Sequence, residues 1–396
     1  MGARGQDPAR APLKIAFVAQ DGLSTVNFGR WFAQEFQRRS GVEFWTASSR
    51  DLYDKEIAAL GSRHVDLTTA RFIRPLSDML YAGRLYALAR RERFDVLVSF
   101  GTKPNLFAPP AARLAGVPRV LLAVRGLGRT FGDQAGPSGR FLSAIVGRLY
   151  RLACRSAHRV WFTNPRDRAR FIEAGLVGEE KTFLTTNSVN LEHFSLARVD
   201  PTATDGVRAE LGLAKSDFVV IMVARLLRAK GLGEFLDAAR ILEGVPSLRF
   251  LLVATPEPNS PDSVPDAFVD ELRRQPNLVW QAFRKDIREL YALADVAVLP
   301  SYYQEGGYPR ALLEPMALAK PVIAADTPDC RGPVEEGGNG YLVPVRDAGA
   351  LADRIERLRR DPDLRLRFGR RSADIARTRF DDRAVGLQVL AELGVG

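Results

Sequence analysis

Residues 300–320 read PSYYQEGGYPRALLEPMALAK, and this stretch decides how the second half of the chain folds. The apolar run at 295–300 (DVAVLP) predicts a strand that leads into it. The pair Gly306 and Gly307 then predicts a tight turn, and Pro309 stands where the first residue of an apolar helix is expected. A strand, a glycine turn and a helix N-terminus present free backbone N–H groups at the positive end of the helix dipole. The stretch therefore predicts an anion site of the kind that binds phosphate.

Two carboxylates flank this turn. Glu305 precedes the glycine pair, and Glu314 lies in the helix that follows. A carboxylate accepts two hydroxyl donors well, so the ligand is expected to offer hydroxyls as well as phosphate, as a nucleotide-sugar does. A helix N-terminal acid that complements the dipole would also explain Glu305. It explains Glu314 poorly, because Leu312, Leu313 and Met316 predict a mostly buried helix.

The composition is that of a globular protein large enough for two domains. The chain has 396 residues, of which 46% are apolar and 26% are charged. Two cysteines exclude a disulfide framework and favour a reducing, cytoplasmic compartment. Three widely spaced histidines argue against a zinc site, and no apolar run reaches the roughly 20 residues that span a bilayer. Residues 1–12 (MGARGQDPARAP) predict a short disordered tail.

Strand-like and helix-like patterns alternate along the chain, which predicts parallel βαβ units with right-handed crossovers. We expect an α/β protein with two doubly wound, Rossmann-like domains that face a central cleft, with ligands at the carboxyl ends of the strands. The first domain spans 13–196 and the second spans 209–380, joined by a polar linker at 197–208. The last helix, at 381–396, is expected to cross back to the first domain.

Two basic residues follow the first strand of the second domain. Arg225 and Lys230 leave the carboxyl end of that strand just before a helix opens at Gly231. Two fixed cations at this place could neutralise the charge that grows on a departing diphosphate, a role that a divalent metal ion has in other enzymes. Ordinary loop cations at a strand end are the alternative interpretation.

Basic residues concentrate in the first half of the chain. Residues 1–200 carry 30 Lys and Arg against 18 Asp and Glu, whereas the remainder carries 27 against 29. The first half is therefore expected to meet something anionic: nucleic acid, anionic lipid and pyrophosphate qualify, and a merely solvated basic surface is the alternative. Residues 138–155 (SGRFLSAIVGRLYRLACR) predict a basic amphipathic helix that could lie on an anionic membrane surface or pack on the core.

Several motifs together resemble the retaining glycosyltransferases of family four, whose fold is GT-B, and they cover the chain from about residue 14 to residue 382. In the second half these motifs are 224–226 (ARL) with 230–231 (KG), 283–287 (FRKDI), 290–295 (LYALAD), 305–317 (EGGYPRALLEPMA), 320–323 (KPVI) and 339–344 (NGYLVP). In the first half, similarity to the PglA-like and CapM-like branch, which extends undecaprenyl-diphosphate-linked sugars, comes from 103–105 (KPN), 126–128 (GLG), 162–165 (FTNP) and 187–190 (NSVN).

The resemblance implies a role for each matching residue. The implied catalytic residues are Arg225 and Lys230, which bind the donor diphosphate, and Glu305, which contacts the sugar. Glu314 is implied to hold the ribose. The implied donor-binding set is Phe283, Arg284, Glu305, Gly306, Gly307, Tyr308, Pro309 and Glu314. The implied acceptor or cleft side is Gly22, Lys103, Asn105, Arg125, Gly126, Gly128, Asn164 and Asn187. Such enzymes retain the anomeric configuration and need no metal ion or other cofactor.

Two of the departures from the family pattern bear on the chemistry of the site. Eight residues separate Glu305 from Glu314, one more than is usual, and an extra residue in the glycine turn could re-aim Glu305. The histidine that is frequent in the first domain of the family is not apparent here, because Arg125 and Gly126 occupy that region. No general base is therefore assigned.

These observations predict an enzyme, a retaining glycosyltransferase that moves a hexose or N-acetylhexosamine from a nucleotide-diphosphate sugar, with a UDP-sugar expected. The expected acceptor is a lipid-linked, polyprenyl-diphosphate saccharide of bacterial polysaccharide or glycan synthesis, reached from the cytoplasm or from the inner face of the cytoplasmic membrane. A soluble or other lipid acceptor is one alternative, and a sugar-nucleotide epimerase of the same architecture is another. A nucleic-acid-binding protein is disfavoured, because the chain has no helix-turn-helix, zinc or RNP-type motif.

Overall fold

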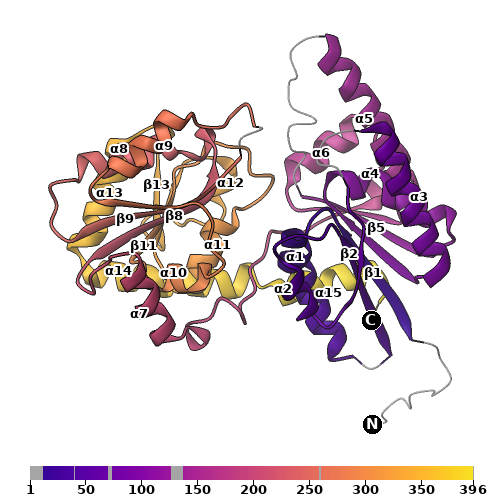
Figure 1. Ribbon diagram of the computed structural model, residues 1–396, viewed down its shortest axis with the longest axis horizontal. Helices are drawn as coiled ribbons and strands as arrows, with labels where there is room; N and C mark the ends of the chain where they lie inside the picture. Colours follow the sequence, from indigo (N-terminus) through magenta and orange to yellow (C-terminus); the bar gives the residue numbers. More distant parts are fainter. Residues whose placement is uncertain (1–11, 40, 70–73, 126–136, 258–259, 396) are drawn as a thin grey trace. The chain divides into compact units, whose positions relative to one another are not determined.

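The two halves of the chain fold as separate α/β units in the computed structural model, which describes residues 12–39, 41–69, 74–125, 137–257 and 260–395 (Figure 1). The first unit runs to Thr185 and also includes Gly386–Gly396. The second unit is Thr186–Val385. Among the described residues, no helix combines the length and the apolar character that crossing a membrane requires.

A seven-stranded parallel sheet in the order β3-β2-β1-β4-β5-β6-β7 forms the centre of the first unit. Its strands are β1 (Leu13–Ala19), β2 (Val42–Ser48), β3 (Arg63–Asp66), β4 (Val96–Phe100), β5 (Arg119–Val124), β6 (Arg159–Phe162) and β7 (Thr182–Leu184). Every residue of β4 is buried, as expected for a parallel strand with helices on both faces. The chain reverses its direction across the sheet between β1 and β4, which makes this the switch point where such sheets bind ligands.

Helices cover both faces of the first sheet. They are α1 (Gly22–Gln37), α2 (Asp54–Ala58), α3 (Pro75–Glu92), α4 (Thr102–Leu114), α5 (Pro137–Ser156), α6 (Pro165–Glu173) and the C-terminal α15 (Asp382–Glu392). Three of them, α3, α4 and α5, lie side by side with α4 in the middle (Figure 1). The part of α15 that belongs to the first unit packs on α1, because a Cβ at Gly386 would collide with the ring of Trp31.

The second unit repeats this architecture with a six-stranded parallel sheet in the order β10-β9-β8-β11-β12-β13. The strands are β8 (Phe218–Leu226), β9 (Leu248–Pro256), β10 (Leu278–Gln281), β11 (Val296–Leu299), β12 (Val322–Ala325) and β13 (Gly340–Val343). The helices are α7 (Pro201–Glu210), α8 (Leu232–Ile241), α9 (Asp266–Arg274), α10 (Ile287–Leu293), α11 (Arg310–Ala317), α12 (Pro328–Arg331), α13 (Ala348–Arg360) and α14 (Pro362–Arg379). The predicted α/β class with two doubly wound sheets is confirmed.

The boundary between the units differs from the predicted one. Residues 186–196, assigned to the first domain from the sequence, belong to the second unit, where Val189 pairs with Asp381. The segment 197–208, expected as a linker, carries most of helix α7. Asp200 caps this helix by accepting the backbone N–H of Thr202, so capping rather than apolar periodicity starts it. The predicted tail at 1–12 lies outside the described residues except for its last position.

Candidate active site

The glycine turn after β11 has the geometry that the sequence predicted. Gly306 and Gly307 have φ angles of +71° and +130°, in the region that favours glycine. Pro309 is the N-cap of α11, with extended backbone, one position before the helix proper. Within the described part of the chain, the backbone N–H groups of Gly307 and Tyr308 donate to no other residue. They are therefore available to an anion at the N-terminus of α11.

Lys230 lies directly against this turn. It ends η4 (Arg228–Lys230), the 3₁₀ turn after β8, and its Nζ atom lies 2.6 and 2.5 Å from the two carboxylate oxygens of Glu305. Only 8% of the Lys230 side chain and 10% of the Glu305 side chain are exposed. Ser301 donates its hydroxyl to the same carboxylate at 2.8 Å. The predicted cation and the predicted carboxylate thus form one buried ion pair.

The second predicted cation joins Lys230 over a shared aromatic ring. The ring centroid of Tyr303 is 4.4 Å from Nζ of Lys230 and 5.0 Å from the guanidinium carbon of Arg225. Arg225 also forms an ion pair with Glu257 at 2.9 Å, just after β9. Cation–π attraction and two carboxylates therefore stabilise two like charges close together. The sequence analysis identified neither Tyr303 nor Glu257. For Tyr303, the available signal was an aromatic residue two positions before Glu305.

Glu305 is fixed through its backbone as well as its side chain. Its N–H donates to Oδ2 of Asp329, a buried residue of α12, at 2.9 Å. Asn187 donates its side-chain amide to the carbonyl oxygen of Tyr308 at 2.7 Å, on the far side of the glycine pair. The extra residue of the turn thus leaves Glu305 directed at Lys230. Asn187, grouped with the acceptor side from the sequence, lies in the second unit and supports the glycine turn.

The other predicted donor residues are differently arranged. Glu314 is buried on α11 and pairs with Arg310 at 2.6 Å; burial raises the pKa of this carboxyl, and Arg310 opposes the rise. Phe283 follows β10 and is exposed. The guanidinium of Arg284 is occupied by ion pairs with Glu210 and Asp286, so its side chain presents no unpaired charge.

Two residues on the predicted acceptor side open helices at the carboxyl ends of strands. Gly22 begins α1 after β1 and donates its N–H to Asp51 at 2.8 Å; a Cβ at this position would collide with that carboxylate. Asn164 is the N-cap of α6 after β6, and its side-chain oxygen accepts the N–H of Asp167 at 2.8 Å. Both positions lie at the edge of the sheet where parallel sheets bind ligands.

Three more residues of the predicted acceptor side already have structural partners, and two others lie outside the described residues. Lys103 is buried on α4 and pairs with Asp78 at 2.5 Å. Asn105, also buried, donates to the carbonyl oxygen of Ala123 at 2.7 Å. Arg125 follows β5, and its guanidinium lies 4.1 Å from the ring centroid of Phe28. Gly126 and Gly128 fall in the segment that the structure does not describe.

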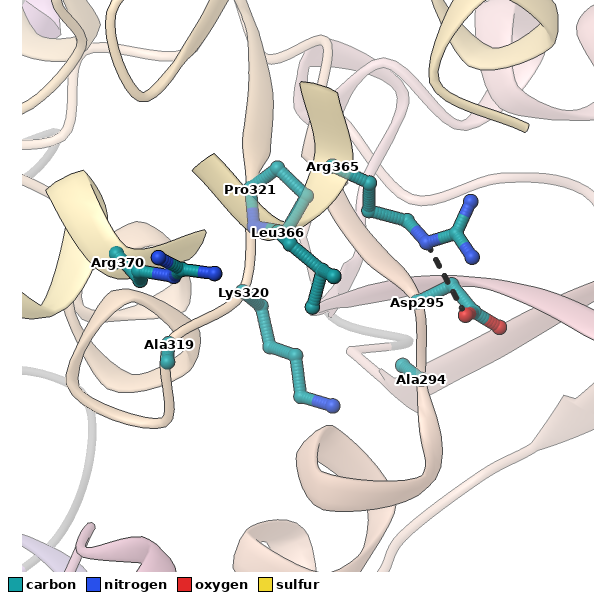
Figure 2. A pocket seen from close by; sticks show the side chains of 8 residues that line it. All are labelled: Ala294, Asp295, Ala319, Lys320, Pro321, Arg365, Leu366 and Arg370. Carbon is teal, nitrogen blue, oxygen red and sulfur yellow. Dashed lines mark ion pairs between the residues drawn. The ribbon is translucent and has the colours of Figure 1, made fainter. Parts of the chain in front are cut away.

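A pocket of about 270 Å³ lies elsewhere in the second unit (Figure 2). Asp295 and Pro321, which line it, directly precede β11 and β12, so it lies at the edge opposite the glycine turn. Arg365 and Asp295 form an ion pair across it at 3.6 Å. Lys320 donates to the carbonyl oxygen of Ala292 at 2.7 Å, near the end of α10, and burial lowers its pKa to about 8. These bonds give the pocket a structural role at a helix C-terminus.

The described residues include no group of three or more His, Cys, Asp or Glu side chains placed to hold a metal ion. The contacts described above make up a candidate active site of two cations, two carboxylates, one tyrosine and the free N–H groups of a helix N-terminus. That combination can bind a diphosphate and stabilise the charge that it gains as a leaving group.

Comparison with known proteins agrees with this chemistry. The family model described as Glycosyl transferases group 1 matches residues 204–374, and the one described as Glycosyl transferase 4-like domain matches residues 28–187. The N,N'-diacetylbacillosaminyl-diphospho-undecaprenol alpha-1,3-N-acetylgalactosaminyltransferase of Campylobacter jejuni is 25% identical over 379 residues, 96% of this chain and 97% of the relative. The capsular polysaccharide biosynthesis glycosyltransferase CapM of Staphylococcus aureus is 24% identical over 364 residues, 89% of each chain.

Solved structures show the same fold. Anabaena Alr3699/HepE in complex with UDP-glucose matches with a TM-score of 0.77 at 21% identity, over 96% of this chain and 99% of that one. WaaG, a glycosyltransferase involved in lipopolysaccharide biosynthesis, matches with a TM-score of 0.70 at 16% identity, over 96% of this chain and all of that one. The chain belongs to the glycosyltransferases of the GT-B fold, with a glycosyl transferase 4-like first half and a glycosyl transferases group 1 second half.

Proposed function

We propose that the protein transfers a hexosyl or N-acetylhexosaminyl group from a UDP-sugar to a lipid-linked, polyprenyl-diphosphate saccharide, with retention at the anomeric carbon. The observation that carries the donor half is the convergence of Arg225 and Lys230 on Tyr303, next to the free N–H groups of the turn. Two fixed cations beside a helix N-terminus suit a diphosphate better than they suit a single phosphate or a carboxylate.

In this proposal, the diphosphate replaces protein carboxylates. Glu305 and Glu257 neutralise the two cations in the structure, and an entering diphosphate brings the negative charge that takes their place. Glu305, released from Lys230, can then accept a hydroxyl of the sugar. The bond between the anomeric carbon and the diphosphate breaks with its electron pair on UDP. The acceptor hydroxyl adds on the same face, and its proton passes to the departing phosphate oxygen. The two cations stabilise that charge, so the reaction requires no metal ion.

Relatives support the choice of substrates. The Escherichia coli relative named UDP-Gal:alpha-D-GlcNAc-diphosphoundecaprenol alpha-1,3-galactosyltransferase is 27% identical over 304 residues, 76% of this chain and 75% of its own. The Campylobacter jejuni relative is likewise named for a diphospho-undecaprenol acceptor. HepE is described in complex with UDP and with UDP-glucose.

Such an acceptor places the enzyme at the inner face of the cytoplasmic membrane, and α5 is the predicted contact. Of the predicted surface at 138–155, the structure describes the side chains from residue 144 onward. Arg148 and Arg155 are exposed there, whereas Arg151 donates to the carbonyl oxygen of Gly175 at 3.2 Å and so caps α6. Among the described side chains of α5, Arg148 and Arg155 are therefore the arginines that can meet anionic lipid.

The test measures UDP or GDP release from a panel of UDP- and GDP-sugars, with a polyprenyl-diphosphate saccharide, with a soluble sugar and with no acceptor. We expect release with a UDP-sugar and the lipid-linked acceptor, in the presence of a chelator, and no epimerised sugar nucleotide from donor alone. Arg225→Ala and Lys230→Ala should each abolish UDP release. Arg228→Ala, which removes an exposed cation from the 3₁₀ turn that contains Lys230, should not. Release that survives both site variants, or only an epimerised donor, would reject the proposal.

A further inference from the structure

Helix α3 exposes three large aliphatic side chains on its outer surface. Leu76, Met79 and Leu80 are 79%, 71% and 67% exposed. Their spacing of three and four residues places them on one side of the helix. Tyr81, on the inner side, is buried in the core beneath. Exposing such an aliphatic stripe to water is unfavourable, because covering it would gain the free energy of hydrophobic burial.

The charges around the stripe have one sign. Arg84 and Arg90 are exposed along the same helix. Its acidic residues are both neutralised: Asp78 is buried against Lys103 at 2.5 Å, and Glu92 pairs with Arg91 at 2.7 Å. The outer surface of α3 is thus apolar at its N-terminal end and cationic towards its C-terminal end.

The other helices of this layer share that character. Neither α4 nor α5 contains an acidic residue. Leu114, at the end of α4, is 79% exposed, and Leu152 of α5 is 53% exposed between the exposed Arg148 and Arg155. Since α4 lies between α3 and α5, both flanks of one layer expose aliphatic and arginine side chains together (Figure 1).

We propose that α3 docks the protein on an anionic lipid bilayer, with Leu76, Met79 and Leu80 entering the boundary between headgroups and acyl chains. The exposed Arg84 and Arg90 of α3 and Arg148 and Arg155 of α5 then face lipid phosphates. Charge complementarity selects this occupant: aliphatic side chains with arginines and no unpaired acid suit an anionic lipid surface, which needs no matching shape. The purpose of docking rests on the proposed lipid-linked acceptor, whereas the docking itself does not. The proposal adds α3 to the contact expected from α5.

The first test is flotation with vesicles of phosphatidylcholine, with and without phosphatidylglycerol. The wild-type protein should float with the anionic vesicles and less so at high salt. Leu76→Ser with Leu80→Ser should weaken partition by about tenfold or more, because two aliphatic side chains no longer insert. The matched control is Ile241→Ser with Leu366→Ser, two residues of the second unit that are each 58% exposed. Flotation that is equal for all three proteins would overturn the proposal.

The second test measures insertion directly. Met79→Cys can be labelled selectively with an environment-sensitive dye, because the native Cys154 and Cys330 are buried. Anionic vesicles should shift its emission to the blue, while a label at Leu366→Cys should not respond. A label at position 79 that is shielded only at high protein concentration, with a dimer by light scattering, would assign the stripe to a second copy and reject the bilayer.

Activity separates this inference from the proposed function. If the wild-type protein floats but transfers sugar to no lipid-linked acceptor, the proposed function fails and the docking surface stands. If it transfers sugar to a detergent-dispersed acceptor but never floats, the docking inference fails alone. The Leu76→Ser and Leu80→Ser variant should keep its activity on the detergent-dispersed acceptor, because neither residue is among those assigned to the candidate active site.

Discussion

The ammonium of Lys230 contacts both carboxylate oxygens of Glu305, at 2.6 and 2.5 Å, although 75 residues separate them in the chain. Both side chains are nearly buried, so each charge depends on the other. Removing one partner of such a pair leaves a desolvated charge, which typically costs 3–5 kcal/mol, whereas replacing both by apolar groups can be neutral.

The first prediction separates the stability of this pair from its function. Lys230→Met should lower the free energy of unfolding by about 3 kcal/mol, and Lys230→Met with Glu305→Leu should recover most of that loss. Urea unfolding measures both changes. The double variant should remain inactive in UDP release, because neither the cation nor the sugar-contacting carboxylate is present. A double variant that regains activity together with stability would show that the pair is structural only.

The second prediction concerns Tyr303, whose ring faces both cations. Tyr303→Leu should weaken UDP binding by about fivefold to thirtyfold, because two cation–π contacts of about 0.5–1 kcal/mol each no longer stabilise the cation pair. Tyr303→Phe keeps the ring and should bind UDP nearly as the wild type does. Isothermal titration with UDP measures the difference. Equal affinities for the Leu and Phe variants would mean that the ring does not position the cations.

The third prediction tests the close contact between η4 and β11. Gly231 has a φ of +84°, and a Cβ there would collide with the carbonyl oxygen of Pro300. Gly231→Ala should therefore cost on the order of 1–3 kcal/mol and displace Lys230, with loss of activity. Gly233→Ala is the matched control: nothing lies within 4 Å of its added Cβ, and it lies inside α8. That control should gain about 0.5–1 kcal/mol in urea unfolding.

Local patterns predicted the parts of this site that lie within one stretch of chain. The apolar strand β11, the glycine turn and the helix after it follow from residue order alone, and so does the placement of Arg225 and Lys230 at a strand end. The pairing of Arg225 with Glu257 could not be predicted. It joins side chains at the carboxyl ends of two strands, and the hydrophobic periodicity of a strand does not show how far such side chains reach. The polar helix α7 was missed for a related reason: its start depends on a cap.

The fourth prediction concerns the pH dependence of stability through Lys320. Burial lowers the pKa of its ammonium to about 8 from an ordinary value of 10.5. At pH 7 the Lys320 side chain is protonated in both the folded and the unfolded chain, so the folded state bears the full cost of burying the charge. Between pH 8 and 10.5 the unfolded state binds more protons, so the contribution of Lys320 to stability becomes more favourable as pH rises.

Lys320→Met removes this titration together with the bond to Ala292. The free energy of unfolding of the variant minus that of the wild type should therefore fall as pH rises from 7 to 10, whatever its value at pH 7. Urea unfolding at a series of pH values measures that difference. Lys215→Met, the same substitution at a side chain that is 79% exposed, is the matched surface variant and is measured in parallel. A Lys320→Met difference that is constant or grows with pH would show that the buried ammonium is protonated at least as easily as a solvated one.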